Sequence, residues 1–271
     1  ASSNIVDTTS TCNYPITAAA LYQFENTPNA TCGPNPSSTQ YLTYVAGVPQ
    51  LGASNKALYY VGGAENSGVG TEWLSSTAIV DSQQNLSISF WINFAAFGTG
   101  YQYLWTSYVT GDMGIFMDNT GSSTGYSQIR GNVYNGGSQY VYSQELVIST
   151  WYHVVLTRST SAGMVLYING TSVDTNSSTT QPAVYTAYND SIGCYGYTPS
   201  GTRTEFKGSI DQFRAFQSVL TPAQVTQLYN ESNITTTNGR PSSPTEGLMR
   251  ENETTGKMEF YDGSLWQEIT D

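Results

Sequence analysis

The segment WYHVVLTRSTSAGMVLYINGTSV, residues 151–173, constrains the fold of this chain more than any other. It contains two runs of alternating apolar and polar residues, separated by a polar loop that ends at Gly163, and the second run meets Asn169-Gly170. Asn-Gly after such a run is a strong signal for a tight β-hairpin, because both residues adopt positive φ readily. The segment therefore predicts three consecutive antiparallel strands.

The residues before this segment predict more strands. In LSISFWINF, residues 86–94, every second residue is a large apolar one, so one face of the strand is expected in the core. Four further short runs follow, each rich in β-prone residues and bounded by Gly, Asn or Ser: YQYLWTSYVT, MGIFMDN, QIRGNVYNGG and YVYSQELVI. Short strands joined by turns indicate an all-β domain.

One helix is predicted, in VLTPAQVTQLY near residue 221. Thr221 is a favourable N-cap, Pro222 suits the first helical position, and Gln224 can bond back to the amide of Thr221. In the strand before it the alternation breaks, since Ile210 and Phe213 fall on opposite faces. A β-bulge, or a strand buried on both faces, would explain that break.

The charge of the chain excludes some partners. Its formal net charge is −11, from 20 acidic and 9 basic residues, and no basic cluster suitable for binding phosphates is present. Nucleic acid is therefore not an expected partner. No run approaches 18 apolar residues, so membrane insertion is not expected either.

The three cysteines leave two interpretations open. Cys12 and Cys32 flank the first predicted strand and could pair, which would leave Cys194 free. The odd count favours the other interpretation, three reduced thiols in a reducing compartment.

The order of these segments resembles the laminin-G-like branch of the concanavalin A-like jelly-roll superfamily. The resemblance is carried by KALYYVGG, by LSISFWINF, by the segment 151–173 and by FKGSIDQFRAFQSVLTPAQVTQLY. It implies an all-β fold, a two-sheet antiparallel jelly-roll sandwich. Local patterns add one short C-terminal helix and a small β-meander tail to this sandwich. We expect an N-terminal arm at 1–17, the sandwich at 18–232, a linker at 233–245 and the tail module at 246–271.

Carbohydrate sites usually combine exposed aromatic rings with amide or carboxylate groups that bond hydroxyls. The segment RGNVYNGGSQYVY and the loop YGYTPSGTR supply the candidate ligand-binding residues Asn132, Tyr134, Asn135, Gln139, Tyr140, Tyr195 and Tyr197. The alternative is that these tyrosines only cover sheet faces through cross-strand pairing. Calcium is a candidate cofactor, with possible ligands at Asp118, Asn119 and Asp190, although their spacing is not that of an EF-hand.

No catalytic grouping is recognisable. Glucan hydrolases of the superfamily carry paired carboxylates on one strand, and the nearest acidic groupings here lie in the tail, so we expect no enzymatic activity. His153, the only histidine, has no nucleophile or acid at a catalytic offset and is expected to pack or to form a hydrogen bond. Asp211 is expected to bond nearby backbone amides.

The C-terminal segment differs in composition from the rest. From Asn238 onward, 34 residues hold 10 of the 29 charged side chains. GLMRENETTGKMEFYDGSLWQEI predicts a small β-meander that buries too little apolar surface to be stable alone. Its docking residues are expected to be Leu248, Met258, Phe260 and Trp266.

This tail resembles a short module found at the ends of structural proteins of tailed bacteriophages. The resemblance implies a non-catalytic virion surface protein, capsid-decorating or fibre-like, that is assembled in the host cytoplasm. Its expected partners are other virion proteins, a host-surface glycan, or further copies of itself. The alternatives are an extracellular or cell-surface carbohydrate-binding adhesion lectin and, with less support, a polysaccharide-active enzyme.

Overall fold

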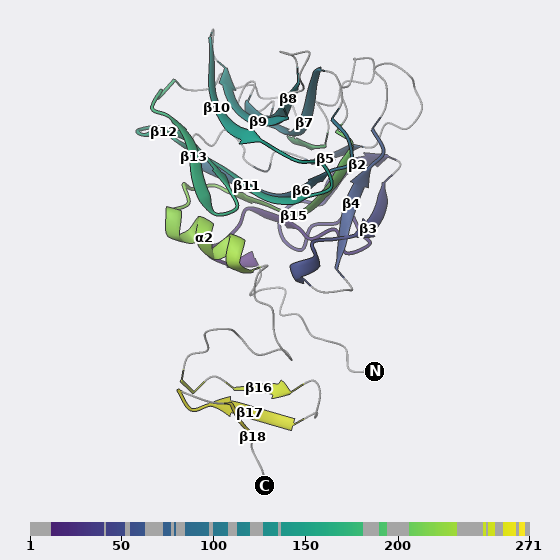
Figure 1. Ribbon diagram of the computed structural model, residues 1–271, viewed down its shortest axis with the longest axis vertical. Helices are drawn as coiled ribbons and strands as arrows, with labels where there is room; N and C mark the ends of the chain where they lie inside the picture. The colour runs from purple at the N-terminus through teal and green to yellow at the C-terminus, as the bar shows by residue number, and fades with distance from the viewer. Residues whose placement is uncertain are drawn as a thin grey trace.

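The residues that the computed structural model describes form two large antiparallel sheets, one short α-helix after β15 (Gly208–Phe216) and a separate small sheet (Figure 1). It describes residues 12–40, 42–51, 55–62, 73–76, 79, 85–97, 100–107, 113–119, 127–134, 137–180, 190–193, 206–231, 246–247, 249–252, 257–263 and 266–268. The two large sheets pack face to face, which is the jelly-roll sandwich that the sequence predicts.

One sheet has eight strands in the order β13-β12-β11-β6-β15-β4-β3, with β1 also paired to β15. Its strands are β1 (Ala20–Tyr22), β3 (Thr43–Ala46), β4 (Lys56–Tyr60), β6 (Leu86–Phe94), β11 (Trp151–Ser159), β12 (Gly163–Ile168), β13 (Thr171–Asn176) and β15 (Gly208–Phe216). The predicted hairpin forms β11, β12 and β13, and its turn has positive φ at both Asn169 and Gly170.

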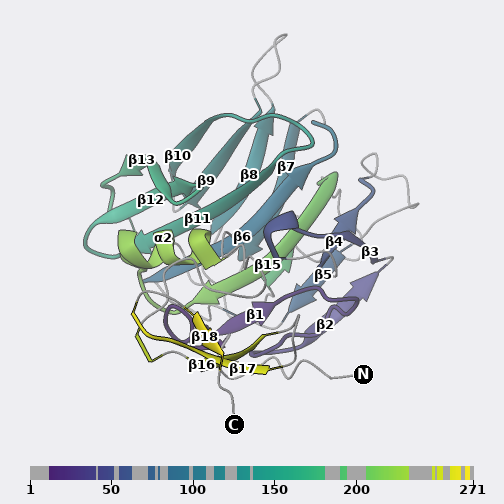
Figure 2. The same cartoon turned by 60° about the horizontal axis from the view of Figure 1, so that its bottom comes forward.

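The other sheet has seven strands in the order β10-β9-β8-β7-β14-β5-β2, and Figure 2 shows β7 to β10 side by side. Its strands are β2 (Pro36–Gln40), β5 (Trp73–Ser76), β7 (Gly100–Ser107), β8 (Met113–Asn119), β9 (Gln128–Tyr134), β10 (Ser138–Glu145) and β14 (Asp190–Ile192). A 3-10 turn, η1 (Pro49–Leu51), lies between β3 and β4.

The main core lies between the two sheets. From β6 it receives the four residues that the alternation predicts, Ile88, Phe90, Ile92 and Phe94. In β15 both predicted explanations hold: every residue is buried, and the register shifts between Asp211 and Arg214, where Gln212 has φ 48°. The bulge turns Ile210 and Phe213 to the same face, so both join the core.

A second core covers the outer face of the eight-stranded sheet. Helix α2 (Pro222–Glu231) begins with the predicted capping box: the Thr221 amide donates to Gln224 Oε1 at 2.9 Å, and the Gln224 amide donates to Thr221 Oγ1 at 3.3 Å. Leu220, Val225 and Leu228 pack on this face together with Tyr14 and Ile16 of the predicted arm. Within the described residues, no helix has the length and apolar character needed to span a bilayer.

Two polar residues of the eight-stranded sheet have structural roles, as predicted. Asp211 accepts hydrogen bonds from the amides of Val48 (3.1 Å) and Gln212 (2.7 Å) and from Asn55 Nδ2 (2.7 Å). His153 is buried, and its Nε2 lies 2.9 Å from Ser89 Oγ. Burial, and to a smaller extent Arg214, lowers the pKa of His153 to about 3, so the ring is neutral.

Cys12 and Cys32 form a disulfide, so the favoured interpretation of three reduced thiols is wrong for this pair. The odd count says nothing about two residues that the fold brings together. The amide of Leu21 donates to the carbonyl of Cys32, and the amide of Ala18 donates to the carbonyl of Cys12, which places both cysteines beside β1. Cys194 lies outside the described residues.

The tail forms a three-stranded sheet of β16 (Met249–Asn252), β17 (Lys257–Tyr261) and β18 (Trp266–Glu268). Met249 pairs with Phe260, and Met258 lies two residues before Phe260, so the three side chains share a face. Met249 is 57% exposed, Met258 44% and Phe260 37%. Of the other predicted docking residues, Leu248 and the side chain of Trp266 lie outside the described set.

Candidate functional site: an aromatic cavity on the seven-stranded sheet

A cavity of about 210 Å³ opens on the outer face of the seven-stranded sheet. Strand alternation creates it, because Ile115 and Met117 of β8 point into the core while Gly114 and Phe116 point outward. The cavity is lined from four adjacent strands by Tyr101, Tyr103, Thr106, Ser107, Met113, Gly114, Phe116, Arg130, Asn132, Tyr134, Ser138 and Tyr140.

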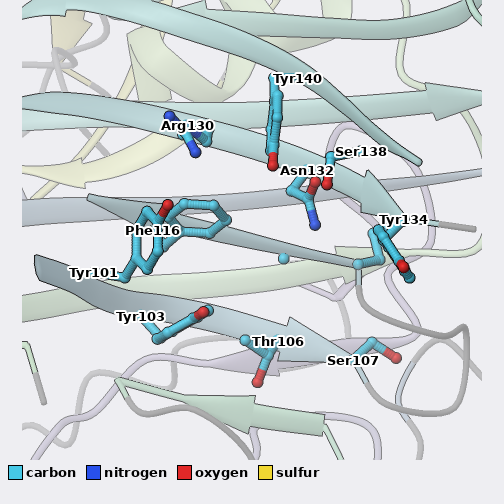
Figure 3. A pocket seen from close by; sticks show the side chains of 12 residues that line it. Tyr101, Tyr103, Thr106, Ser107, Phe116, Arg130, Asn132, Tyr134, Ser138 and Tyr140 are labelled. Carbon is cyan, nitrogen blue, oxygen red and sulfur yellow. The ribbon is translucent and has the colours of Figure 1, made fainter. Parts of the chain in front are cut away.

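The floor of the cavity lies at Gly114. Gly114 pairs with Thr106 on one side and with Asn132 on the other, and Asn132 pairs with Tyr140, so these residues form one row across the sheet. Because Gly114 has no side chain, the row is open at its centre, and the labelled side chains surround that space (Figure 3). An aromatic wall and a rim of hydroxyl and amide groups therefore face a shared hollow.

Arg130 is the centre of the aromatic wall. Its guanidinium carbon lies 4.4 Å from the ring centroid of Tyr140, 4.9 Å from Tyr142, 5.5 Å from Phe116 and 5.6 Å from Tyr101. Such distances permit cation–π attraction, worth about 0.5–2 kcal/mol for each well-placed pair. The guanidinium thus holds rings from β7, β8 and β10 together.

Asp118 completes this cluster. Its Oδ2 forms an ion pair with Arg130 Nη2, and each of the two side chains is 13% exposed. Arg130 Nε is buried and has no hydrogen-bond partner in the described part of the chain. Burial is also the main cause that raises the pKa of the neighbouring Tyr142, so its hydroxyl stays protonated at neutral pH.

The rings beside Arg130 pack on one another. Tyr101 and Phe116 meet edge to face with centroids 5.1 Å apart, and Tyr103 lies 5.2 Å from Phe116. Tyr134, at the opposite end of the cavity, is 41% exposed. The cavity therefore offers both a packed, rigid aromatic surface and an accessible ring.

The structure brings three of the predicted ligand-binding residues together, since Asn132, Tyr134 and Tyr140 all line the cavity. Gln139 does not belong to this group: it pairs with Val133, a core residue, and so lies on the inward side of β10. Asn135, Tyr195 and Tyr197 lie outside the described residues.

Sequence reasoning missed the part of the site on β7 and β8, together with Arg130. The signal was the same in each strand: Tyr101 and Tyr103, Gly114 and Phe116, and Arg130 and Asn132 occupy alternate, outward positions. The alternative, that tyrosines cover sheet faces, also applies: Tyr103 lies opposite Phe116 across β7 and β8, and Tyr140 contacts Tyr142 along β10, with centroids 5.9 Å apart.

The structure does not bring the three predicted metal ligands together. Asp118 pairs with Tyr101 at one end of β7, and Asp190 pairs with Ser107 at the other end. Six residues of extended strand separate these ends by roughly 20 Å, too far for one cation. Asp190 Oδ2 instead accepts from the amide of Ile79 at 2.6 Å, and the side chain of Asn119 lies outside the described set. No group of three or more His, Cys, Asp or Glu suited to a metal occurs among the described residues.

The two antiparallel sheets packed face to face define a jelly-roll sandwich of the concanavalin A-like class. Residues 66–226, more than half of the chain, match the laminin-G family model described as the concanavalin A-like lectin/glucanases superfamily. The chain belongs to this family. A search of curated protein sequences finds no match.

Solved structures with the same fold include binding domains of larger proteins. Domain 4 of AbnA, an extracellular arabinanase from Geobacillus stearothermophilus solved with arabinotriose, has a TM-score of 0.58 and 18% identity over 78% of this chain and 98% of that domain. The binding domain of Paraclostridial Mosquitocidal Protein 1 has a TM-score of 0.59 and 14% identity, over 89% of this chain and 62% of the other.

The binding domain of Botulinum neurotoxin DC, solved with SialylT, has a TM-score of 0.56 and 16% identity. That match covers 79% of this chain and 50% of the neurotoxin domain. At these identities the similarities show the shared fold.

Proposed function

We propose that this chain is a non-catalytic carbohydrate-binding domain and that the cavity around Gly114 is its glycan site. The observation that carries the proposal is the combination of packed aromatic rings, hydroxyls and an amide around one open hollow. Sugar rings have apolar C–H faces and hydroxyl edges. Aromatic rings can cover the faces, while Asn132, Thr106 and Ser138 can bond the hydroxyls.

The composition of the cavity favours binding over hydrolysis. Glycoside hydrolases use two carboxyl groups placed about 5–9.5 Å apart across the scissile bond. Among the described residues that line the cavity there is no carboxylate. Asp118, beside it, is engaged by Arg130. An assay for reducing-sugar release on a panel of algal and bacterial polysaccharides would reveal an activity contrary to this part of the proposal.

We place this domain on the virion surface of a tailed bacteriophage, where it would decorate the capsid or a fibre and bind a host-surface glycan. The tail module supports this setting, and the exposed face of Met249, Met258 and Phe260 suits docking on a neighbouring virion protein. The Cys12–Cys32 disulfide is compatible with an exterior location, since disulfides persist on virion and cell surfaces.

The disulfide equally favours the second candidate, a secreted or cell-surface adhesion lectin, which also works in an oxidising environment. Removal of residues 238–271 distinguishes the two. On a virion, the truncated protein should stay folded and keep its glycan affinity but no longer assemble on the particle. A particle map that shows no density for the protein would contradict the virion setting.

Binding itself is tested with a glycan array, followed by titration calorimetry on each hit. Tyr140→Ala removes a ring that lines the cavity, and Tyr152→Ala, on the eight-stranded sheet, is a matched control. We expect Tyr140→Ala to weaken binding by about 10- to 100-fold, as for a buried aromatic contact, while the control changes it little. Equal affinities for the two variants would contradict the assignment of the site.

A further inference from the structure

The charges around the cavity are balanced locally. Among the described residues that line it, Arg130 is the only charged side chain, and its partner Asp118 carries the opposite charge. The other polar groups are hydroxyls and one amide. The whole chain, in contrast, has a formal net charge of −11, which repels polyanions before any contact forms.

The side-on fork of the Arg130 guanidinium is closed to a second carboxylate. That fork pairs Nε with Nη2. Asp118 already binds Nη2, and Nε is buried. Rings of Tyr140, Tyr142, Phe116 and Tyr101 surround the guanidinium. An acidic sugar at the remaining nitrogens would bring a second carboxylate close to that of Asp118, and the two like charges would repel.

From this geometry we infer that the cavity selects neutral glycans and rejects glycans whose sugars carry a carboxylate. The inference rests on the proposed function and specifies its ligand class. Asp118 acts as the selectivity residue: it neutralises Arg130 without lining the cavity itself. Arg130 then serves as an aromatic-stacking core and not as an anion site.

The test uses two pairs of β-1,4-linked oligosaccharides that differ only at C6: those of mannan with those of mannuronan, and those of glucan with those of glucuronan. Affinities are measured by calorimetry on the full chain at low and high salt. For the pair that binds, we expect the neutral member to bind at least about tenfold more tightly than the uronic acid member at high salt, where long-range repulsion is screened.

Asp118→Asn should free Nη2 with little change in shape. We expect it to raise the affinity for the uronic acid member by about tenfold or more, because a charge-assisted hydrogen bond becomes available. The affinity for the neutral partner should stay within about threefold of wild type. Glu145→Gln is the matched control, because it changes the net charge nearby but leaves the ion pair intact. Glu145 is exposed at the end of β10 and pairs with Gln128 of β9, which in turn pairs with Asp118 of β8.

Each outcome is decisive. Tighter binding of the uronic acid member by the wild type would overturn the inference but leave the proposed function intact. If Asp118→Asn gains no more than Glu145→Gln, the ion pair is not the basis of selectivity and the inference fails. An array on which no glycan binds, together with binding of neither member of any pair by a protein whose thermal unfolding is cooperative, would overturn the proposed function and this inference with it.

Discussion

Three glycines of the same sheet allow the cavity to be tested by one type of substitution, glycine to leucine. At Gly114 an added Cβ points toward the cavity and meets the Trp105 carbonyl oxygen at 3.1 Å and Thr106 Cγ2 at 3.3 Å, so the neighbours must move by a few tenths of an ångström. Gly137, on the adjacent hairpin, has nothing within 4 Å of an added Cβ. At Gly131 the added Cβ points into the core, 2.7 Å from Leu156 Cδ1.

The volumes set the expected effect. Removal of a leucine side chain from a protein core leaves a cavity of about 150 Å³. A leucine at position 114 should therefore fill most of the roughly 210 Å³ hollow. We expect Gly114→Leu to weaken glycan binding by at least about 100-fold, or about 2.7 kcal/mol. The free energy of unfolding should change by only about 1–2 kcal/mol, because the tight contacts are partly offset by the lower chain entropy of the unfolded state.

The other two variants are the controls. Gly137→Leu should alter neither affinity nor stability, and Gly131→Leu should lower the free energy of unfolding by about 3 kcal/mol or more through overpacking. Affinity is measured by calorimetry and stability by urea denaturation on the same preparations. A folded Gly114→Leu protein that binds within about threefold of wild type would refute the assignment of the cavity as the glycan site.

Three other predictions concern stability. Arg130→Met should lower the free energy of unfolding by about 2–4 kcal/mol, because it removes four ring contacts and the ion pair with Asp118. An unchanged melting temperature would contradict the stabilising role of this cluster. Burial raises the pKa of Asp211 from 3.8 to about 7, although its hydrogen bonds act to lower it. The folded protein therefore binds this proton more tightly than the unfolded chain does. The resulting contribution to the free energy of unfolding is fully present below pH 3.8 and is lost as the pH rises through 7. The free energy of unfolding should fall by on the order of 4 kcal/mol over this pH range. In urea denaturation at a series of pH values, Asp211→Asn should not show this fall. The same pH dependence in both proteins would contradict the prediction. Reduction of the Cys12–Cys32 disulfide, whose cysteines have a sequence separation of 20, should lower the free energy of unfolding by about 3 kcal/mol. Dithiothreitol should therefore lower the melting temperature of the wild type but not that of a double serine variant. A wild type insensitive to the reductant would contradict this prediction.

Local patterns predicted most of the fold correctly. The alternation of residues 86–94, the Asn169-Gly170 turn and the capping box at Thr221 each depend on neighbours a few positions away, and each appears in the structure. The irregularity between Ile210 and Phe213 is also visible in the sequence as a break in alternation, and the structure has a β-bulge at this point.

The site was less predictable because it depends on register between strands. Gly114 forms a floor only because Thr106 and Asn132 pair with it from two other strands, and no local pattern specifies that alignment. For the same reason sequence proximity could not show that Asp118 would meet Arg130. The Cys12–Cys32 disulfide was considered but not favoured for a related reason, since the count of cysteines carries no information on which of them the chain brings together.

The second core and the cavity lie on opposite outer faces of the sandwich. Residues 12–18 and helix α2 both lie on the outer face of the eight-stranded sheet, whereas the cavity opens on the outer face of the seven-stranded sheet (Figure 1). Both ends of the sandwich therefore leave from the side opposite the cavity. A support joined to either end would therefore hold the domain by the side opposite the cavity, so an array of such domains would present every cavity to the surrounding solution.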